Sequence, residues 1–196
     1  MEQNCLEQIR HSINHCKNNI AVCEKQIKKC SSASLAILET KKSAFKDNLL
    51  IWNTMGHIQM ASIEMKEYMK RLSVESIDEW EERDVIKSVY TAIYETSKKL
   101  VDATADIFKF IKHYFPNYDY RAFTDVRKEL CRFRESNTSE LTRVRNTIDA
   151  HRDVEVSVQI EVIEGLHLAN AVQLIVEYEG CLLYTSPSPR DRSLSR

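Results

Sequence analysis

The sequence predicts an all-α fold, an elongated helical bundle with long N-terminal helices. Up to Gly180 the chain holds only three glycines and one proline, so few residues that favour turns interrupt it. Apolar residues recur in steps of three and four, which is the spacing of helices buried on one side. The length, about 180 residues without the tail, suits a single domain with its own core.

Residues 1–75 are predicted to form a long helical hairpin. The helix expected at 2–30 carries a continuous apolar seam, made of Leu6, Ile9, Ile13, Cys16, Ile20, Cys23, Ile27 and Cys30. Such a seam needs a partner along its whole length, and its cysteines are interpreted as small buried hydrophobes. Small polar residues at 31–34 favour a turn, after which a second helix runs from Leu35 to Leu72 with methionines as core filler.

Residues 76–118 are predicted to form a third long helix. Ser76 and Glu79 have the spacing of a capping box, and Pro116 ends the segment. The apolar stripe of this helix consists of Trp80, Ile86, Val89, Ile93, Leu100, Ile107 and Ile111. The turn at Pro116 is surrounded by aromatic residues, for which packing of the turn is the default interpretation and stacking of unpaired RNA bases the alternative. They are Phe108, Phe110, Tyr114, Phe115, Tyr118, Tyr120 and Phe123.

Residues 119–180 are expected to be helical too, with a break at 136–140, where Asn137 and Glu140 form a second capping pattern. Residues 154–163 fit two patterns, because their alternating β-branched side chains suit a strand and their apolar spacing suits a helix. A lone strand would have no partner in this chain, so a helix is predicted. A last helix is expected around 168–178.

Basic residues gather in residues 121–152, which carry eight arginines and lysines against five acidic residues, a net charge of +3. The rest of the chain up to Gly180 has a net charge of −6. This asymmetry indicates either a face for a polyanion such as RNA or a solvated helix with Arg–Glu pairs.

Within this basic segment, Arg145, Asn146 and His151 are the strongest candidates for chemistry. Arginine offers a planar, permanently charged fork for phosphate oxygens, and histidine transfers protons near neutral pH. In an α-helix, six residues advance about 9 Å, so the arginine and the histidine would flank a phosphodiester rather than touch. The alternative is a structural helix in which Arg145 pairs with Asp149 at i+4 and His151 packs at the helix end.

Arg145-Asn146-x4-His151 resembles the R-x(4–6)-H motif of HEPN domains, with the resemblance covering mainly residues 120–179. It implies a HEPN-like C-terminal part, a homodimer that brings two motifs into one cleft, and a metal-independent endoribonuclease without cofactors. Toxin–antitoxin or phage-defence roles and a neutralising partner protein belong to what it implies. Arg145, Asn146 and His151 would be catalytic, and we expect RNA-binding by Arg134, Arg143 and Arg152.

Two alternatives to a ribonuclease are an interaction module and a metal-dependent hydrolase. A non-catalytic helical interaction module would use the exposed seam of the first helix to bind a partner. A metal-dependent hydrolase has little support, because the sequence lacks H-E-x-x-H, Cys-x-x-Cys and clustered carboxylates; His11 and His15, at i and i+4, are a weak metal candidate. No glycine-rich loop for nucleotide phosphates is present.

Residues 181–196 resemble the translation of a sequencing adapter and are treated as an artefactual tail. The native sequence is therefore expected to be truncated near Gly180, with its further residues missing. Without Cys181 five cysteines remain, and this odd number predicts reduced thiols in a cytoplasmic protein. Neither a secretory leader nor a membrane span is expected.

Overall fold

The computed structural model describes residues 2–36, 42–73, 77–150 and 155–185, and the side chains of residues 5–32, 48–73, 77–148 and 155–182. Every element within these ranges is helical, which confirms the predicted all-α bundle. The elements are α1 (Glu2–Ala36), α2 (Lys42–Leu72), α3 (Glu79–Tyr114), α4 (Arg121–Val144), the π-helical η2 (Arg145–Ala150), α5 (Val156–Glu164) and α6 (Leu168–Thr185). None of the described helices is long and apolar enough to cross a membrane.

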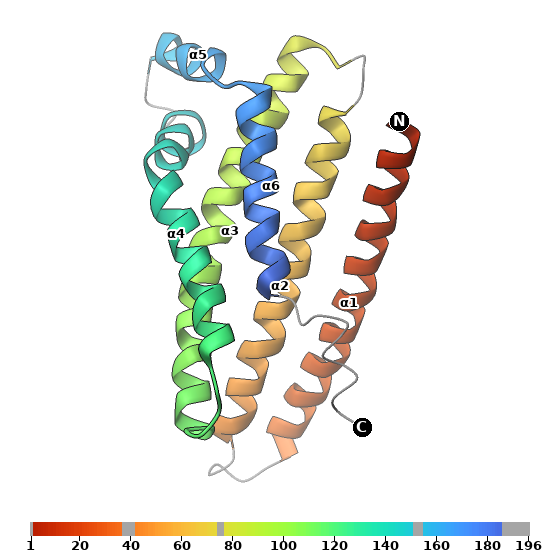
Figure 1. Cartoon of the computed structure of the whole chain (residues 1–196), viewed down its shortest axis with the longest axis vertical. Coiled ribbons are helices and arrows are strands. Elements are labelled where there is room, and N and C mark those ends of the chain that lie inside the picture. The colour runs from red at the N-terminus through yellow and green to blue at the C-terminus, as the bar shows by residue number, and fades with distance from the viewer. Residues whose placement is uncertain (1, 37–41, 74–76, 151–154, 186–196) are drawn as a thin grey trace.

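The helix α3 is the centre of the bundle and packs against α2, α4, α6 and η2. Its buried side chains recur at helical spacing, and Val85, Val89 and Ile93 are fully buried. Each such side chain stabilises the fold by roughly 1.5–3 kcal/mol through removal of apolar surface from water. The helix α6 fills the space between α2 and α4 (Figure 1). The main core therefore lies among α2, α3, α4 and α6.

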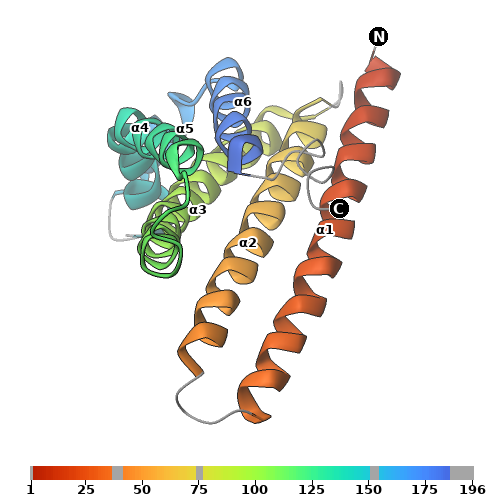
Figure 2. The same cartoon turned by 60° about the horizontal axis from the view of Figure 1, so that its bottom comes forward.

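The helix α1 lies at the edge of the bundle, alongside α2 and apart from α4 (Figures 1 and 2). Ile13, Cys16 and Cys23 on its seam are buried against α2, so the predicted hairpin is confirmed. A Cβ atom on Gly56 would lie 3.9 Å from the Cβ of Cys23, which shows how closely the two helices approach. The two buried cysteines pack as small side chains, as predicted.

Two helix breaks that were predicted from polar residues are not found in the structure. The turn expected at 31–34 is wrong, because α1 continues to Ala36. The break expected at 136–140 is also wrong: Asn137 donates to the carbonyl of Phe133 (2.8 Å) and Thr138 to that of Arg134 (2.5 Å), so both side chains bond within an unbroken α4. Polar side chains that satisfy carbonyls four residues back are compatible with a continuous helix.

The start of α3 differs by two residues from the predicted capping box. Its N-cap is Asp78, which accepts hydrogen bonds from the backbone of Trp80 (2.9 Å) and Glu81 (3.1 Å). Ser76 lies outside the described residues. Trp80, predicted to belong to the apolar stripe, is instead 58% exposed, because it lies on the first turn of α3. Pro116 follows the end of α3, as predicted.

Residues 156–164 form α5, which confirms the helix and excludes the strand for these residues. The last helix, α6, continues past Gly180 to Thr185. Leu182 is only 1% exposed and extends the buried stripe of Ile175 and Tyr178. The apolar side chains at the start of the suspected tail thus support about two more turns of helix than the sequence predicted.

Candidate functional site

The candidate site lies where α4 changes into a π-helical turn. The α-helix ends at Val144, and residues Arg145–Ala150 form η2, with wider i→i+5 hydrogen bonding. These six residues are therefore helical, as expected for this part of the chain, but they do not have the α-helical geometry on which the expected spacing of Arg145 and His151 was based. π-Helical turns are rare and occur often at functional sites. His151 itself, with Arg152, lies outside the described residues.

Arg145 is held by residues of α3. Its Nε lies 3.3 Å from Oε1 of Glu95, and its Cζ lies 5.5 Å from the ring centroid of Tyr94. The side chains of Arg145 and Glu95 are 33% and 41% exposed, so solvent screens this ion pair and its net contribution to stability is below about 1 kcal/mol. The effect of the pair is to fix the direction of the guanidinium.

Asn146 completes the contacts of the arginine. Its Oδ1 accepts a hydrogen bond from Nη1 of Arg145 at 3.3 Å. A guanidinium has five N–H donors, and Glu95 and Asn146 account for two of them. Among the described residues the other donors have no partner. A guanidinium that is oriented, partly exposed and has N–H donors available is able to bind phosphate oxygens.

The partner that the structural alternative assigned to Arg145 was Asp149, whose side chain lies outside the described ones. The carboxylate that Arg145 does contact, Glu95, is fifty residues away in the sequence. No motif connects Glu95 or Tyr94 to the Arg145 segment, so sequence reasoning missed both. The only available signal was that Ile93, directly before them, belongs to the predicted buried stripe of the central helix.

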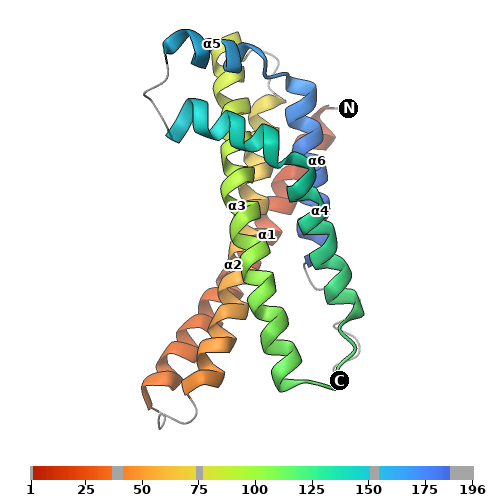
Figure 3. The ribbon, with the colours of Figure 1, turned by 90° about the vertical axis from the view of Figure 1, so that its left-hand side faces the viewer.

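The structure does not bring Arg134 or Arg143, two of the predicted RNA-binding arginines, together with Arg145, and the third, Arg152, lies outside the described residues. Arg143 is exposed, and in a helix a separation of two residues turns the side-chain direction by about 200°. Arg134 lies eleven residues earlier, about 16 Å along a helical path that changes direction within α4 (Figure 3). Near Arg143, burial raises the pKa of Tyr90 to about 12, and its hydroxyl donates to Glu140 (3.2 Å). Tyr90 therefore stays protonated and is no proton acceptor.

No family model, no curated protein and no solved structure matches the chain.

The polyanion face predicted from charge counting is partly neutralised. Three of its cations are engaged by nearby carboxylates, in the pairs Arg121–Asp119 (2.7 Å), Lys128–Asp125 (3.3 Å) and Arg132–Glu129 (2.5 Å). The alternative of a solvated helix with ion pairs thus describes half of the cations of α4. Arg127, Arg134 and Arg143 form no ion pair with a described residue.

A metal centre has no support within the described part of the chain, where no three His, Cys, Asp or Glu side chains stand together. His11 and His15 are both exposed on α1. A groove of about 840 Å³ runs between α4 and α6, lined by residues such as Val126, Phe133 and Cys181, and contains none of the predicted site residues.

Proposed function

We propose that this protein is a metal-independent, HEPN-like endoribonuclease that acts as a homodimer. The observation that carries the proposal is Arg145: a partly exposed arginine at a π-helical turn, oriented by Glu95 and Tyr94 and left with donors that no described residue uses. Preorganised donors of this kind stabilise charge that develops in a transition state more than charge already present.

The proposed reaction needs an acid and a base but no metal. The 2′-oxygen of a ribose attacks the adjacent phosphorus, and the bond from phosphorus to the 5′-oxygen breaks. The products are a 2′,3′-cyclic phosphate and a 5′-hydroxyl. Arg145 neutralises charge on the non-bridging oxygens, and Asn146 holds the phosphate by its amide N–H groups. His151 accepts the proton from the 2′-hydroxyl, and the partner's His151 donates one to the leaving oxygen.

An exposed apolar face beside the motif is the surface through which we propose that two chains associate. The helix α5 contacts η2 and lies at the same end of the bundle (Figure 3). Val162 of α5 is buried, whereas Val156 (68%), Val158 (38%) and Ile160 (38%) are exposed. Exposed apolar side chains beside a candidate site are typical of association surfaces. Two chains that pack through α5 would place their η2 turns near each other.

This face gives a test of the dimer. Replacing Val156 and Ile160 together with glutamate is expected to produce a monomer that no longer cleaves RNA, because four charges would be buried at a two-fold contact. Light scattering coupled to gel filtration measures the mass. The matched control is Val22→Glu, an equally exposed valine (52%) on α1, which should stay dimeric. A dimer that persists in the double variant would place the contact elsewhere.

The alternative, a non-catalytic interaction module, depended on an exposed seam on α1. Ile13, Cys16 and Cys23 are buried against α2, which favours a core role for this seam. The proposal also includes association into a homodimer, RNA as the substrate, a neutralising partner protein, and a role as a toxin or in phage defence.

The function itself is tested by cleavage in EDTA. Wild-type protein is expected to cut a mixture of tRNA and rRNA equally well in EDTA and in magnesium, and His151→Ala is expected to be inactive. A folded dimer that leaves every RNA intact, or that cuts only with magnesium, would contradict the proposal.

A further inference from the structure

The aromatic residues around the turn at Pro116 divide into two groups with different surroundings. Phe108 packs edge-on against Tyr120 (centroids 5.6 Å apart) and parallel to Phe123 (6.3 Å). Arg127 lies over the same ring, with its Cζ 6.0 Å from the centroid. This first group joins α3 to α4 and agrees with the default interpretation of packing.

The second group, the aromatic knuckle, consists of Phe110, Tyr114, Phe115 and Tyr118 and faces solvent. Tyr114, Phe115 and Tyr118 are 41%, 56% and 62% exposed. Phe110 connects them, with its centroid 4.9 Å from that of Tyr114 and 6.2 Å from that of Phe115. Packing between α3 and α4 does not explain these exposed rings.

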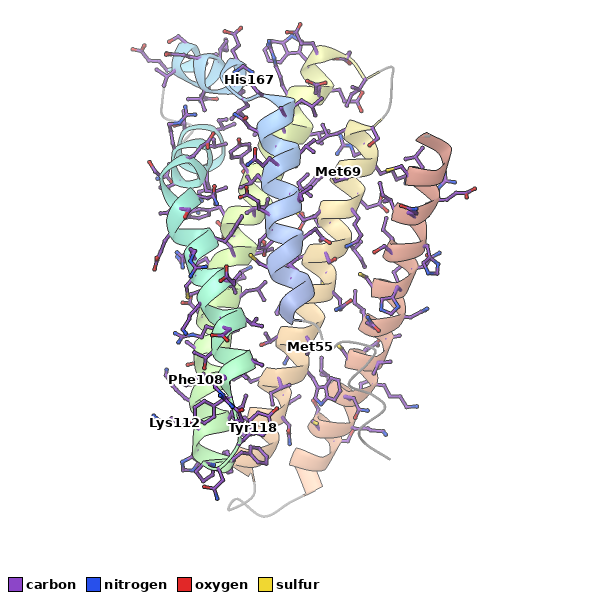
Figure 4. All side chains as sticks on the ribbon, in the orientation of Figure 1. Met55, Met69, Phe108, Lys112, Tyr118 and His167 are labelled. Carbon is purple, nitrogen blue, oxygen red and sulfur yellow. The ribbon has the colours of Figure 1, made fainter. Side chains whose placement is uncertain are left out.

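Positive charge surrounds the knuckle. Residues 108–128 contain five lysines and arginines and two aspartates, a net charge of +3. Three of the five cations are paired, Arg121 with Asp119, Lys128 with Asp125, and Lys109 with Asp106 just before this stretch. Lys112 and Arg127 have no carboxylate partner among the described residues. Figure 4 shows Lys112 and Tyr118 near Phe108, at the end of the bundle opposite His167.

We propose that the aromatic knuckle binds unpaired bases of single-stranded RNA, with Lys112 beside the phosphates. Stacking needs exposed ring faces and tolerates any base, and it is combined with cations in proteins that hold single strands. A membrane surface is less suitable, because the large apolar side chains that are more than a third exposed in residues 108–123 are three rings, two of them with hydroxyl groups, and Ile111 is only partly exposed.

The aromatic knuckle would bind the RNA at a second site, separate from the one at Arg145. It lies at the start of α4, and the 24 residues of that helix, which changes direction along its length (Figure 3), separate it from the turn that begins at Arg145 by about 36 Å of helical path. The inference rests on the proposed function for its ligand class, RNA. Binding can be measured without cleavage, so the two proposals can fail separately.

The test uses the full chain and a 2′-O-methyl oligouridine of about twelve nucleotides, a length within the range of single-strand sites. The methyl group blocks the nucleophile, so the probe stays intact. Replacing Phe115 and Tyr118 together with alanine is expected to weaken binding, measured by fluorescence anisotropy, by at least about tenfold. The matched control is Trp80→Ala, an exposed ring (58%) at the other end of α3, which should bind as wild type does.

Three results would overturn the inference. In the first, the knuckle variant and the Trp80→Ala control bind the oligouridine with equal affinity. In the second, the wild-type protein binds duplex and single-stranded RNA with equal affinity. In the third, the knuckle variant loses binding to phosphatidylserine vesicles but keeps its affinity for RNA. Circular dichroism checks that the variants are folded. Knuckle-dependent binding by a protein that never cleaves RNA would support this inference and contradict the proposed function.

Discussion

Replacing Arg145 with alanine is expected to lower the rate of RNA cleavage at least about 100-fold, with the helical content and the dimer unchanged. The physical reason is that the guanidinium stabilises charge that forms only as the bond to phosphorus is made. Because the ion pair with Glu95 is solvent-screened, its loss should cost the fold little. The measurement is single-turnover cleavage, with circular dichroism on the same sample.

Arg132→Ala is the matched control, because it removes the same charge from an exposed arginine of α4 that is not among the predicted RNA-binding residues. It should keep activity within about threefold of wild type. Equal losses in both variants would mean that Arg145 contributes only general positive charge to RNA binding.

Glu95 refines this prediction, since we interpret it as a positioning residue. Glu95→Gln keeps an oxygen that accepts from Nε of Arg145 but removes the competing negative charge. The KM for RNA should fall while kcat stays within a few-fold, and Arg145→Ala should instead lower kcat. An unchanged KM in Glu95→Gln would show that this carboxylate does not compete with phosphate.

The largest expected effect on stability is at Lys66. Its Nζ contacts Glu179 and Ser62, and Ser62 also donates to Glu179 (3.1 Å) and lies 3.8 Å from the thiol of Cys16. This polar cluster joins α1, α2 and α6. The side chains of Lys66 and Glu179 are only 14% and 15% exposed, and Oε1 of Glu179 has no partner among the described atoms.

Lys66→Met is expected to lower the free energy of unfolding by about 3 kcal/mol, because it leaves a largely buried carboxylate without its cation. Urea denaturation measures the change. Lys70→Met, which removes an exposed pair with Glu67 (3.2 Å), is the control and should cost less than about 1 kcal/mol. Adding Glu179→Gln to Lys66→Met should restore most of the loss. Equal effects at Lys66 and Lys70 would contradict a role for burial.

The sequence predicted the helices well because apolar spacing determines which side of each one is buried. The seam of α1 and the stripe from Ile86 to Ile107 are both read directly from such spacing. Errors arose where a residue type has two local uses. Asn137 and Thr138 are typical of helix starts, yet inside α4 they bond to the preceding turn.

The candidate site could be predicted only in part. Arg145 and Asn146 are adjacent in the sequence, and the structure brings them into contact. The contact with Glu95 depends on how α4 crosses α3, which no local pattern specifies. The π-helical turn, likewise, depends on the packing of η2 against α3 and α5.

The chemical nature of the RNA ends tests the central claim most directly. If the 2′-hydroxyl is the nucleophile, with His151 as proton acceptor and Arg145 at the phosphate, cleavage in EDTA leaves a 2′,3′-cyclic phosphate and a 5′-hydroxyl. Mass spectrometry of the fragments should find these ends. Fragments with 5′-phosphate and 3′-hydroxyl ends would show that water was the nucleophile and would contradict the mechanism.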